Sequence, residues 1–155
     1  RNRSSWRCEC TCGNIVVVNQ LELKNGDTLS CGCLRSSFGE QQIEKILKEQ
    51  NLSYQKEFIF SNLLSENGIP LRFDFAVFND EGELDFLIEY QGVQHYEPKS
   101  KFGGYTGLRK QQYNDMMKRE YCKKHNIILL AIPYTDEGRI SYDYIMNLYY
   151  AHGGY

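Results

Sequence analysis

The acidic residues Asp74 and Glu89 occur in two strand-like segments joined by a short turn. The segments are RFDFAVF (72–78) and LDFLIEYQG (84–92), in which apolar and aromatic residues predominate. If they pair as a hairpin, Asp74 can meet Glu89 across the sheet. Two adjacent carboxylates repel unless a positive charge lies between them, and a divalent cation is the usual partner. The pattern predicts a magnesium site, with acids on a solvated sheet face as the alternative.

Alternation along the two strands indicates which side chains would share this site. In the first strand it places Asp74 on one face and both Phe73 and Phe75 on the other. In the second strand Glu89 and Gln91 share a face. Gln91 could therefore hydrogen-bond a water molecule or a phosphate oxygen beside the carboxylates.

Two predicted helices carry acids on faces that should pack inward. Asp115 lies seven residues from both Leu108 and Cys122, on the same helical stripe, and a carboxylate buried there needs a partner. Glu40 shares a face with apolar residues of its own helix and can point toward the sheet. The alternative for Glu40 is helix capping, because a serine stands three residues before it.

His95 follows the Glu89 strand closely, and it is the histidine nearest to the acidic pair in the sequence. A neutral imidazole at this place could accept a proton from an attacking water molecule. A packed loop histidine is the alternative. His125 at a helix end and His152 in the tail are better explained by the helix dipole and by surface placement.

Five of the six cysteines lie in the first 33 residues, which favours a metal site over disulfide bonds. Neighbours in a Cys-x-Cys pair cannot easily bridge each other, and two such pairs suit tetrahedral zinc. We assign the zinc ligands to the two symmetric pairs, which leaves Cys8 as a bystander. The predicted ligands are Cys10, Cys12, Cys31 and Cys33.

The order of predicted elements indicates an α+β chain with a mixed central sheet flanked by helices. A small zinc module would occupy 1–35, with IVVVNQLEL (15–23) as a short β-hairpin arm, and a larger domain 36–155. Cys122 is predicted as a small core residue. In the larger domain we predict helices over 36–50, 107–125 and 141–150, and strands over 53–60, 72–78, 84–92 and 127–134.

The charge distribution is uneven although the net charge is only −2. Residues 99–124 hold eight Lys and Arg against two acids, whereas residues 36–98 hold four against twelve. A basic face beside an acidic pocket suits an enzyme that binds phosphates and divalent cations, while a solvated helix is the alternative. The candidates for DNA backbone contacts are Lys110, Lys118, Arg119, Lys123 and Lys124.

The apolar runs are too short for a membrane span, which takes about 20 residues, and the start lacks a signal-peptide segment. We therefore expect no membrane partner and a cytoplasmic location. Hydrophobic residues make up 41% of the chain and aromatic residues 14%, which is typical of a folded domain. The missing initial Met leads us to expect a fragment of a longer or processed chain.

The segment IEYQGVQHYEP (88–98), read with RFDF before it and FGGYTGLRKQQYNDMMKREYCKKHNI (102–127) after it, resembles a known group. It is similar to the PD-(D/E)XK nucleases related to the very-short-patch repair endonuclease, including phage homing endonucleases with an EDxHD signature. WRCECTCGN and SCGCL resemble the zinc-ribbon-like module often fused to them. The matching segments extend over most of the chain from Trp6 to Tyr134.

The resemblance implies a restriction-endonuclease-like fold and a homing-type endonuclease that cuts double-stranded DNA with Mg²⁺ in a phage-infected or bacterial cell. The zinc module would bind or position DNA, or stabilise the fold, and a dimer is one open possibility. By position, the resemblance implies a helix acid, a metal-binding aspartate, a second-strand acid, a general base and a helix aspartate. These roles fall on Glu40, Asp74, Glu89, His95 and Asp115.

The chain departs from the group's pattern at one place. The usual EYDG reads Glu89-Tyr90-Gln91-Gly92 here, and a lysine of the E-x-K type is absent. Because of this departure, the sequence does not decide whether the site binds one metal ion or two. A non-catalytic zinc-containing DNA-binding module is the alternative function, and a zinc-stabilised protein-interaction domain is a third.

Overall fold

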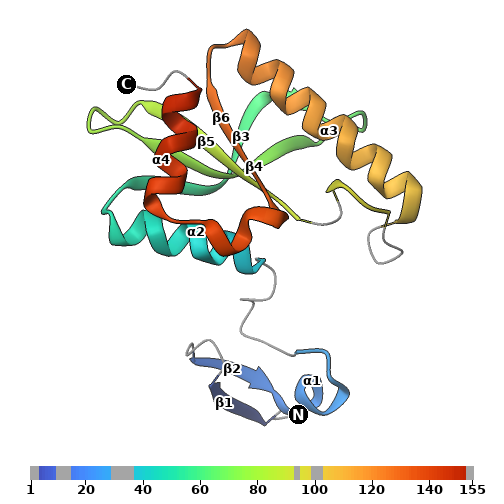
Figure 1. Ribbon diagram of the computed structural model, residues 1–155. Coiled ribbons are helices and arrows are strands. Elements are labelled where there is room, and N and C mark those ends of the chain that lie inside the picture. Colours follow the sequence, from blue (N-terminus) through green and yellow to red (C-terminus); the bar gives the residue numbers. More distant parts are fainter. Residues whose placement is uncertain (1–3, 10–14, 29–36, 93–94, 99–102, 153–155) are drawn as a thin grey trace. The chain divides into compact units, whose positions relative to one another are not determined.

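The computed structural model describes residues 4–9, 15–28, 37–92, 95–98 and 103–152. The chain forms two compact units, residues 1–37 and residues 38–155 (Figure 1). The predicted zinc ligands Cys10, Cys12, Cys31 and Cys33 lie outside the described residues.

The N-terminal unit contains two antiparallel strands, β1 (Ser5–Glu9) and β2 (Ile15–Asn19), followed by the short helix α1 (Gln20–Asn25). Cys8, the cysteine left out of the predicted zinc site, lies in β1 opposite Val16.

The prediction of a hairpin arm over residues 15–23 is wrong. Only Ile15–Asn19 is a strand, and its partner is β1 rather than the second half of the same segment. Residues after Asn19 turn into a helix because the Asn19 side chain accepts a hydrogen bond from the Leu21 amide at 2.9 Å. An asparagine in this position satisfies an amide that the first helical turn leaves unpaired.

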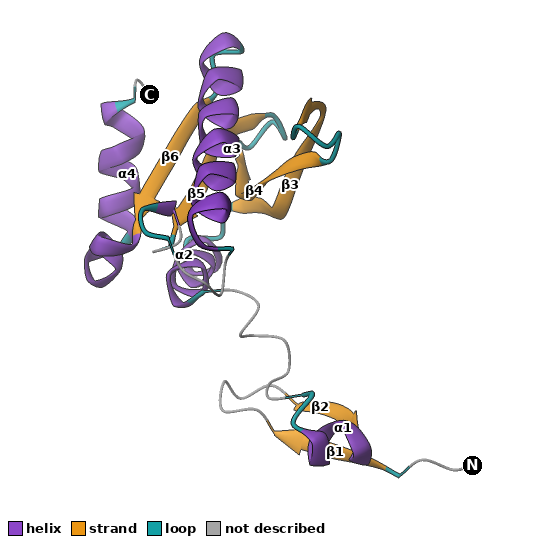
Figure 2. Ribbon diagram, turned by 90° about the vertical axis from the view of Figure 1, so that its right-hand side faces the viewer, coloured by secondary structure: helices purple, strands orange, loops and turns teal. Residues whose placement is uncertain are grey.

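The larger unit is a four-stranded sheet with helices on both faces (Figure 2). This confirms the predicted mixed sheet flanked by helices. The strand order is β3-β4-β5-β6, antiparallel except for the parallel pair β5 and β6. Among the described residues, no helix is long and apolar enough to cross a membrane. The elements are α2 (Phe38–Glu49), β3 (Ser53–Leu64), β4 (Pro70–Phe78), β5 (Leu84–Gln91), α3 (Gly104–Lys124), β6 (Ile128–Pro133), the 3-10 helix η4 (Tyr134–Arg139) and α4 (Tyr142–Ala151).

Two hydrophobic clusters form the core, and each involves different helices. The first joins Leu47 of α2 and Ile145 of α4 to the sheet, including Ile88 of β5. The second joins Cys122 of α3 to sheet residues such as Leu87. Because Leu87 and Ile88 are neighbours in β5, the clusters lie on opposite faces of the sheet. Figures 1 and 2 show the same arrangement, with α3 on one face and α2 and α4 on the other.

Cys122 is confirmed as a core residue. Its side chain is 2% exposed, and burial raises the pKa of the thiol to about 11.

The alternation of side chains along β4 breaks at Asp74. Phe75 packs in the cluster of α2 and α4, whereas Phe73 packs in the cluster of α3, so the prediction that both lie opposite Asp74 is wrong for Phe73. The register places Glu57 of β3 opposite Asp74, and Glu57 has a left-handed backbone with φ 51°. This irregular pair replaces the even pleat that strict alternation requires.

Candidate active site

Asp74 and Glu89 lie next to each other where strands β4 and β5 separate. Phe75 and Ile88 form the backbone pair at this end of the β4–β5 ladder. Asp74 precedes Phe75 and therefore lies just outside the ladder. The Asp74 Oδ2 atom instead accepts a hydrogen bond from the Tyr90 amide at 2.7 Å. The Asp74 and Glu89 side chains are also within hydrogen-bonding reach of one another. The two carboxyl groups therefore meet, as the sequence predicts.

Burial makes full ionisation of this pair unfavourable. Burial raises the pKa of Asp74, although the hydrogen bond from Tyr90 and the nearby positive charge of Lys118 act to lower it. The pKa of Glu89 is raised well above its usual value, first by burial and then by the charge of Asp74. Two carboxyl groups this close in a poorly solvated place favour a bound proton or a bound cation.

Lys118 supplies one positive charge to this pair from the middle of α3. Its ammonium forms an ion pair and hydrogen bond with Glu89. The same nitrogen lies 5.3 Å from the centroid of the Phe73 ring. Lys118 is only 9% exposed, so it lies away from the exposed basic face on which the sequence analysis places it as a DNA contact.

Sequence reasoning missed Lys118 as a site residue, although the signal was present. Lys118 follows Asp115 by three residues and precedes Cys122 by four, so all three share one helical stripe. A cation on an inward stripe next to a carboxylate is a sign of a buried pair.

His95 and Asp115 form a second buried pair. The His95 Nδ1 atom lies 2.7 Å from Asp115 Oδ2, and the two side chains are 9% and 11% exposed. Gln111 donates to the other carboxylate oxygen of Asp115 at 3.2 Å. The charge of His95 also lowers the pKa of Asp74, so both pairs belong to one site. If Nδ1 donates to Asp115, Nε2 is the ring nitrogen that can accept a proton.

Gln91 is held by an aromatic neighbour. The Tyr96 hydroxyl donates to Gln91 Oε1 at 2.5 Å, and the Tyr96 ring lies 5.7 Å from the ring of Tyr134. The carboxamide oxygen is therefore occupied, so the amide NH₂ is the group that can bind a phosphate oxygen.

Glu40 lies beside Tyr90. The pKa of Tyr90 is raised mainly by burial and by the hydrogen bond from its hydroxyl to Glu137. The negative charge of Glu40 makes a further contribution. Tyr90 packs in the cluster of α2 and α4, on the face of the sheet opposite Lys118 and Glu89. The structure thus places Glu40 on the other side of β5 from the ion pair.

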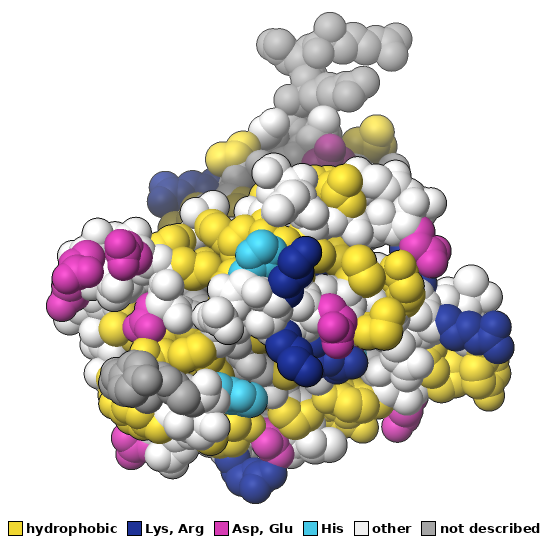
Figure 3. Space-filling view, turned by 90° about the horizontal axis from the view of Figure 1, so that it is seen from above, with side chains coloured by type: hydrophobic (Ala, Val, Ile, Leu, Met, Phe, Trp, Pro, Cys, Tyr) yellow, Lys and Arg dark blue, Asp and Glu magenta, His cyan; other side chains and the backbone are white. Residues whose placement is uncertain are grey.

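The remaining predicted DNA contacts lie on the surface of α3. Figure 3 shows Lys and Arg side chains close together on the face seen from above. The exposed residues of the predicted set are Lys110, Arg119, Lys123 and Lys124.

The carboxylate pair has the donor chemistry of a magnesium site. Among the described residues, no group of three or more His, Cys, Asp or Glu side chains is placed to hold a metal ion. Mg²⁺ usually takes one or two carboxylates and completes its coordination with water and substrate phosphate. Asp74 and Glu89 fit this mode because they offer hard oxygen ligands, and the positive charges of Lys118 and His95 offset their negative charge only in part.

Comparisons with known proteins give relatives in viruses. No family model and no solved structure matches the chain. Uncharacterized protein 094L of Frog virus 3 (isolate Goorha) is 54% identical over 54 residues, which are 34% of this chain and 35% of that protein. Uncharacterized protein 307L of Invertebrate iridescent virus 6 is 39% identical over 54 residues, which are 34% of this chain and 27% of that protein.

A third relative is Uncharacterized protein 033L of Invertebrate iridescent virus 3. It is 35% identical over 66 residues, which are 39% of this chain and 34% of that protein. The chain thus spans about a third of the length of the relatives it matches.

Proposed function

We propose that this chain is a metal-dependent DNA endonuclease with a restriction-endonuclease-like core of the PD-(D/E)XK class. The observation that supports this most is the buried cluster of Asp74, Glu89 and Lys118, with the pair of His95 and Asp115 beside it. A fold gains nothing in stability from crowding carboxyl groups in this way, so the arrangement favours a role in chemistry.

Asp74 and Glu89 would hold Mg²⁺, which supplies the positive charge that stabilises a phosphate undergoing hydrolysis. Lys118 fixes the Glu89 carboxylate through their ion pair. The E-x-K lysine of the resembled group is absent from this chain, and in this proposal Lys118 supplies a positive charge beside the carboxyl groups from α3 instead.

His95 acts as the general base in this proposal. Asp115 holds the imidazole through Nδ1, and Gln111 fixes Asp115 in turn. The ring is thus oriented with Nε2 as the atom that takes the proton from the attacking water.

The N-terminal unit is proposed to hold a structural zinc ion through Cys10, Cys12, Cys31 and Cys33. Tetrahedral thiolate coordination would compensate for the small size of this unit. The viral relatives support a site of action within an infected cell. Double-stranded DNA is the proposed substrate on the basis of the motif resemblance. A homing role is part of the proposal only through the resemblance of the motifs.

A plasmid cleavage assay with Mg²⁺ tests the nuclease. We expect wild-type protein to nick or linearise the plasmid. His95→Ala should lose at least about 100-fold in rate, the usual effect of removing a general base, and Asp74→Asn should also lose cleavage because it removes a proposed Mg²⁺ ligand. Asp80→Asn is the matched control, because Asp80 is exposed in the turn after β4. Intact plasmid under conditions where the wild-type protein binds DNA would instead indicate the non-catalytic module.

A further inference from the structure

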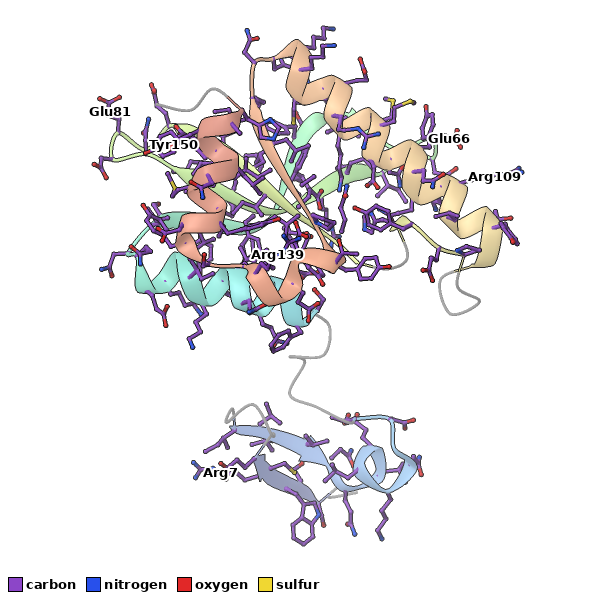
Figure 4. All side chains as sticks on the ribbon, viewed as in Figure 1. Arg7, Glu66, Glu81, Arg109, Arg139 and Tyr150 are labelled. Carbon is purple, nitrogen blue, oxygen red and sulfur yellow. The ribbon has the colours of Figure 1, made fainter. Side chains whose placement is uncertain are left out.

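A cavity of about 420 Å³ lies between α3 and the turn that joins β3 to β4. Arg109 and Lys110 line it from the helix together with Tyr113, and Glu66 lines it from the turn. Figure 4 labels Glu66 and Arg109 on the same side of the molecule, next to α3. No role in the proposed chemistry uses this cavity.

A second cavity, of about 590 Å³, continues the first along the same helix. Its lining includes Met117 and Lys124 of α3 and Asn62–Leu64 at the end of β3. On the side of the sheet, Leu64 lines the second cavity and the next residue, Ser65, lines the first. Both cavities lie between α3 and residues 62–67, and we call this surface of the molecule the groove.

The groove uses a different face of α3 from the candidate active site. Its helix residues recur at steps of three and four, from Thr106 through Lys110 and Tyr113 to Met117. Asp115 and Lys118 lie on the neighbouring stripe, which faces the sheet. A strand of nucleic acid in the groove would thus run alongside the catalytic groups without occupying their place.

The chemistry of the groove fits phosphate. Arg109 and Lys110 are exposed, and among the described residues neither forms an ion pair with a carboxylate. Thr106 and Tyr113 add hydroxyl donors within the same lining. Unpaired cations mixed with hydroxyl groups are the usual contacts to phosphate oxygens.

The length of the groove fits several nucleotides. The helix rises about 1.5 Å per residue, so the face from Thr106 to Lys124 extends about 27 Å. Duplex DNA advances about 3.4 Å per base pair, and this span corresponds to about eight base pairs.

We propose that this groove binds the phosphate backbone of a DNA strand that flanks the scissile bond, with Arg109 and Lys110 as its main contacts. The inference rests on the proposed function in taking DNA as the ligand. To the proposed function it adds the path of the DNA strand along α3 and two contact residues, Arg109 and Lys110. Arg109 has no other assigned role.

Binding of a fluorescent duplex in EDTA, without cleavage, tests the groove. We expect Arg109→Ala/Lys110→Ala to weaken binding and to reduce the slope of log affinity against log salt by about 1.8, because each phosphate contact contributes about 0.9. Lys45→Ala/Lys48→Ala removes the same charge from exposed positions of α2 and is the matched control. Equal slopes for both double variants would overturn the proposal.

Glu66→Gln provides a test that misfolding cannot imitate. Glu66 lines the cavity as an exposed acid, so removing its charge should tighten DNA binding by lowering repulsion with phosphate. Glu49→Gln on α2 is the control, because Glu49 is also exposed and outside the groove. Unchanged or weaker binding by Glu66→Gln alone would contradict the assignment.

The groove and the nuclease can fail separately. Cleavage by wild-type protein with no loss of binding in Arg109→Ala/Lys110→Ala overturns the groove and leaves the nuclease. Loss of binding in that variant, with no cleavage by wild-type protein in Mg²⁺, retains the groove and overturns the nuclease.

Discussion

At the scale of single residues, the ion pair of Lys118 and Glu89 determines how the candidate site is held together. Both side chains are about nine-tenths buried, and Asp74 adds a second carboxyl group to the same place. The ammonium is the one cation that contacts Glu89 among the described residues. Removing it leaves the buried Glu89 carboxylate without its paired charge.

We therefore expect Lys118→Met to lower the free energy of unfolding by about 3–5 kcal/mol, the usual cost of breaking a buried ion pair. Methionine keeps an unbranched apolar side chain of similar length and removes the charge, including the contact of the ammonium with the Phe73 ring. The double variant Lys118→Met/Glu89→Gln should recover most of the loss, because it also removes the unpaired carboxylate. Urea unfolding measures both, and a double variant no more stable than Lys118→Met would contradict this account of the pair.

The pH dependence of stability should report on the same carboxyl groups. Burial raises the pKa of Asp74, and that of Glu89 well above its usual value, so the folded state favours their protonated forms. Their contribution is fully present below about pH 4, the ordinary carboxyl range, and is lost as pH rises through the raised values.

Asp74→Asn/Glu89→Gln should therefore flatten the fall in stability with rising pH, compared with wild-type protein. Urea unfolding over a pH series measures this, and Asp80→Asn serves as the exposed control. Mg²⁺ at neutral pH should raise the thermal midpoint of the wild-type protein more than that of the double variant. Parallel pH curves for the two proteins would show that these carboxyl groups titrate normally.

At the scale of elements, the close packing of α2 on β5 depends on a glycine. A methyl group added at Gly39 would lie 2.1 Å from the ring of Tyr90, so the helix could not keep its position. Tyr90 lies between the site residues Glu89 and Gln91 in β5, and its amide binds Asp74. The contact between α2 and Tyr90 therefore supports the strand that carries the site.

Gly39→Ala should destabilise the protein by about 1–3 kcal/mol or more, because overpacking forces side chains and backbone apart. Gly138→Ala is the control, since an added Cβ there meets no atom within 4 Å. Denaturant unfolding of both variants measures the two stability losses. A stability loss at Gly39 no larger than at Gly138 would mean that α2 shifts freely on the sheet.

At the scale of the whole molecule, the chain offers a separate optical probe for each unit. Trp6 is the single tryptophan and lies in β1 of the N-terminal unit. The helices α2, α3 and α4 all belong to the second unit and dominate the far-ultraviolet circular dichroism.

We expect a zinc chelator to change the fluorescence of Trp6 and to leave the thermal unfolding of the helices unchanged. The reason is that the proposed thiolate ligands all lie in residues 1–37. Cys8→Ser should respond like the wild-type protein, whereas Cys31→Ser should resemble the chelated protein without any chelator. A chelator that leaves Trp6 fluorescence unchanged would rule out zinc in this unit.

The sequence by itself determined the order of the main helices and strands in the larger unit, the sheet with helices on both sides and the burial of Cys122. These follow from local periodicity and from propensities that act over a few residues. It also indicated that Asp74 and Glu89 meet, because two short strands joined by a tight turn pair in only a few registers.

Only the tertiary structure placed Lys118 on Glu89 and Phe73 on the α3 side of the sheet. The physical reason is that the left-handed backbone at Glu57 and the separation of β4 from β5 depend on contacts between distant segments. Periodicity along one strand or helix carries no information about which element packs against it. The stripe shared with Asp115 and Cys122 indicates that Lys118 faces inward, but only the packing of α3 across β5 makes Glu89 its partner.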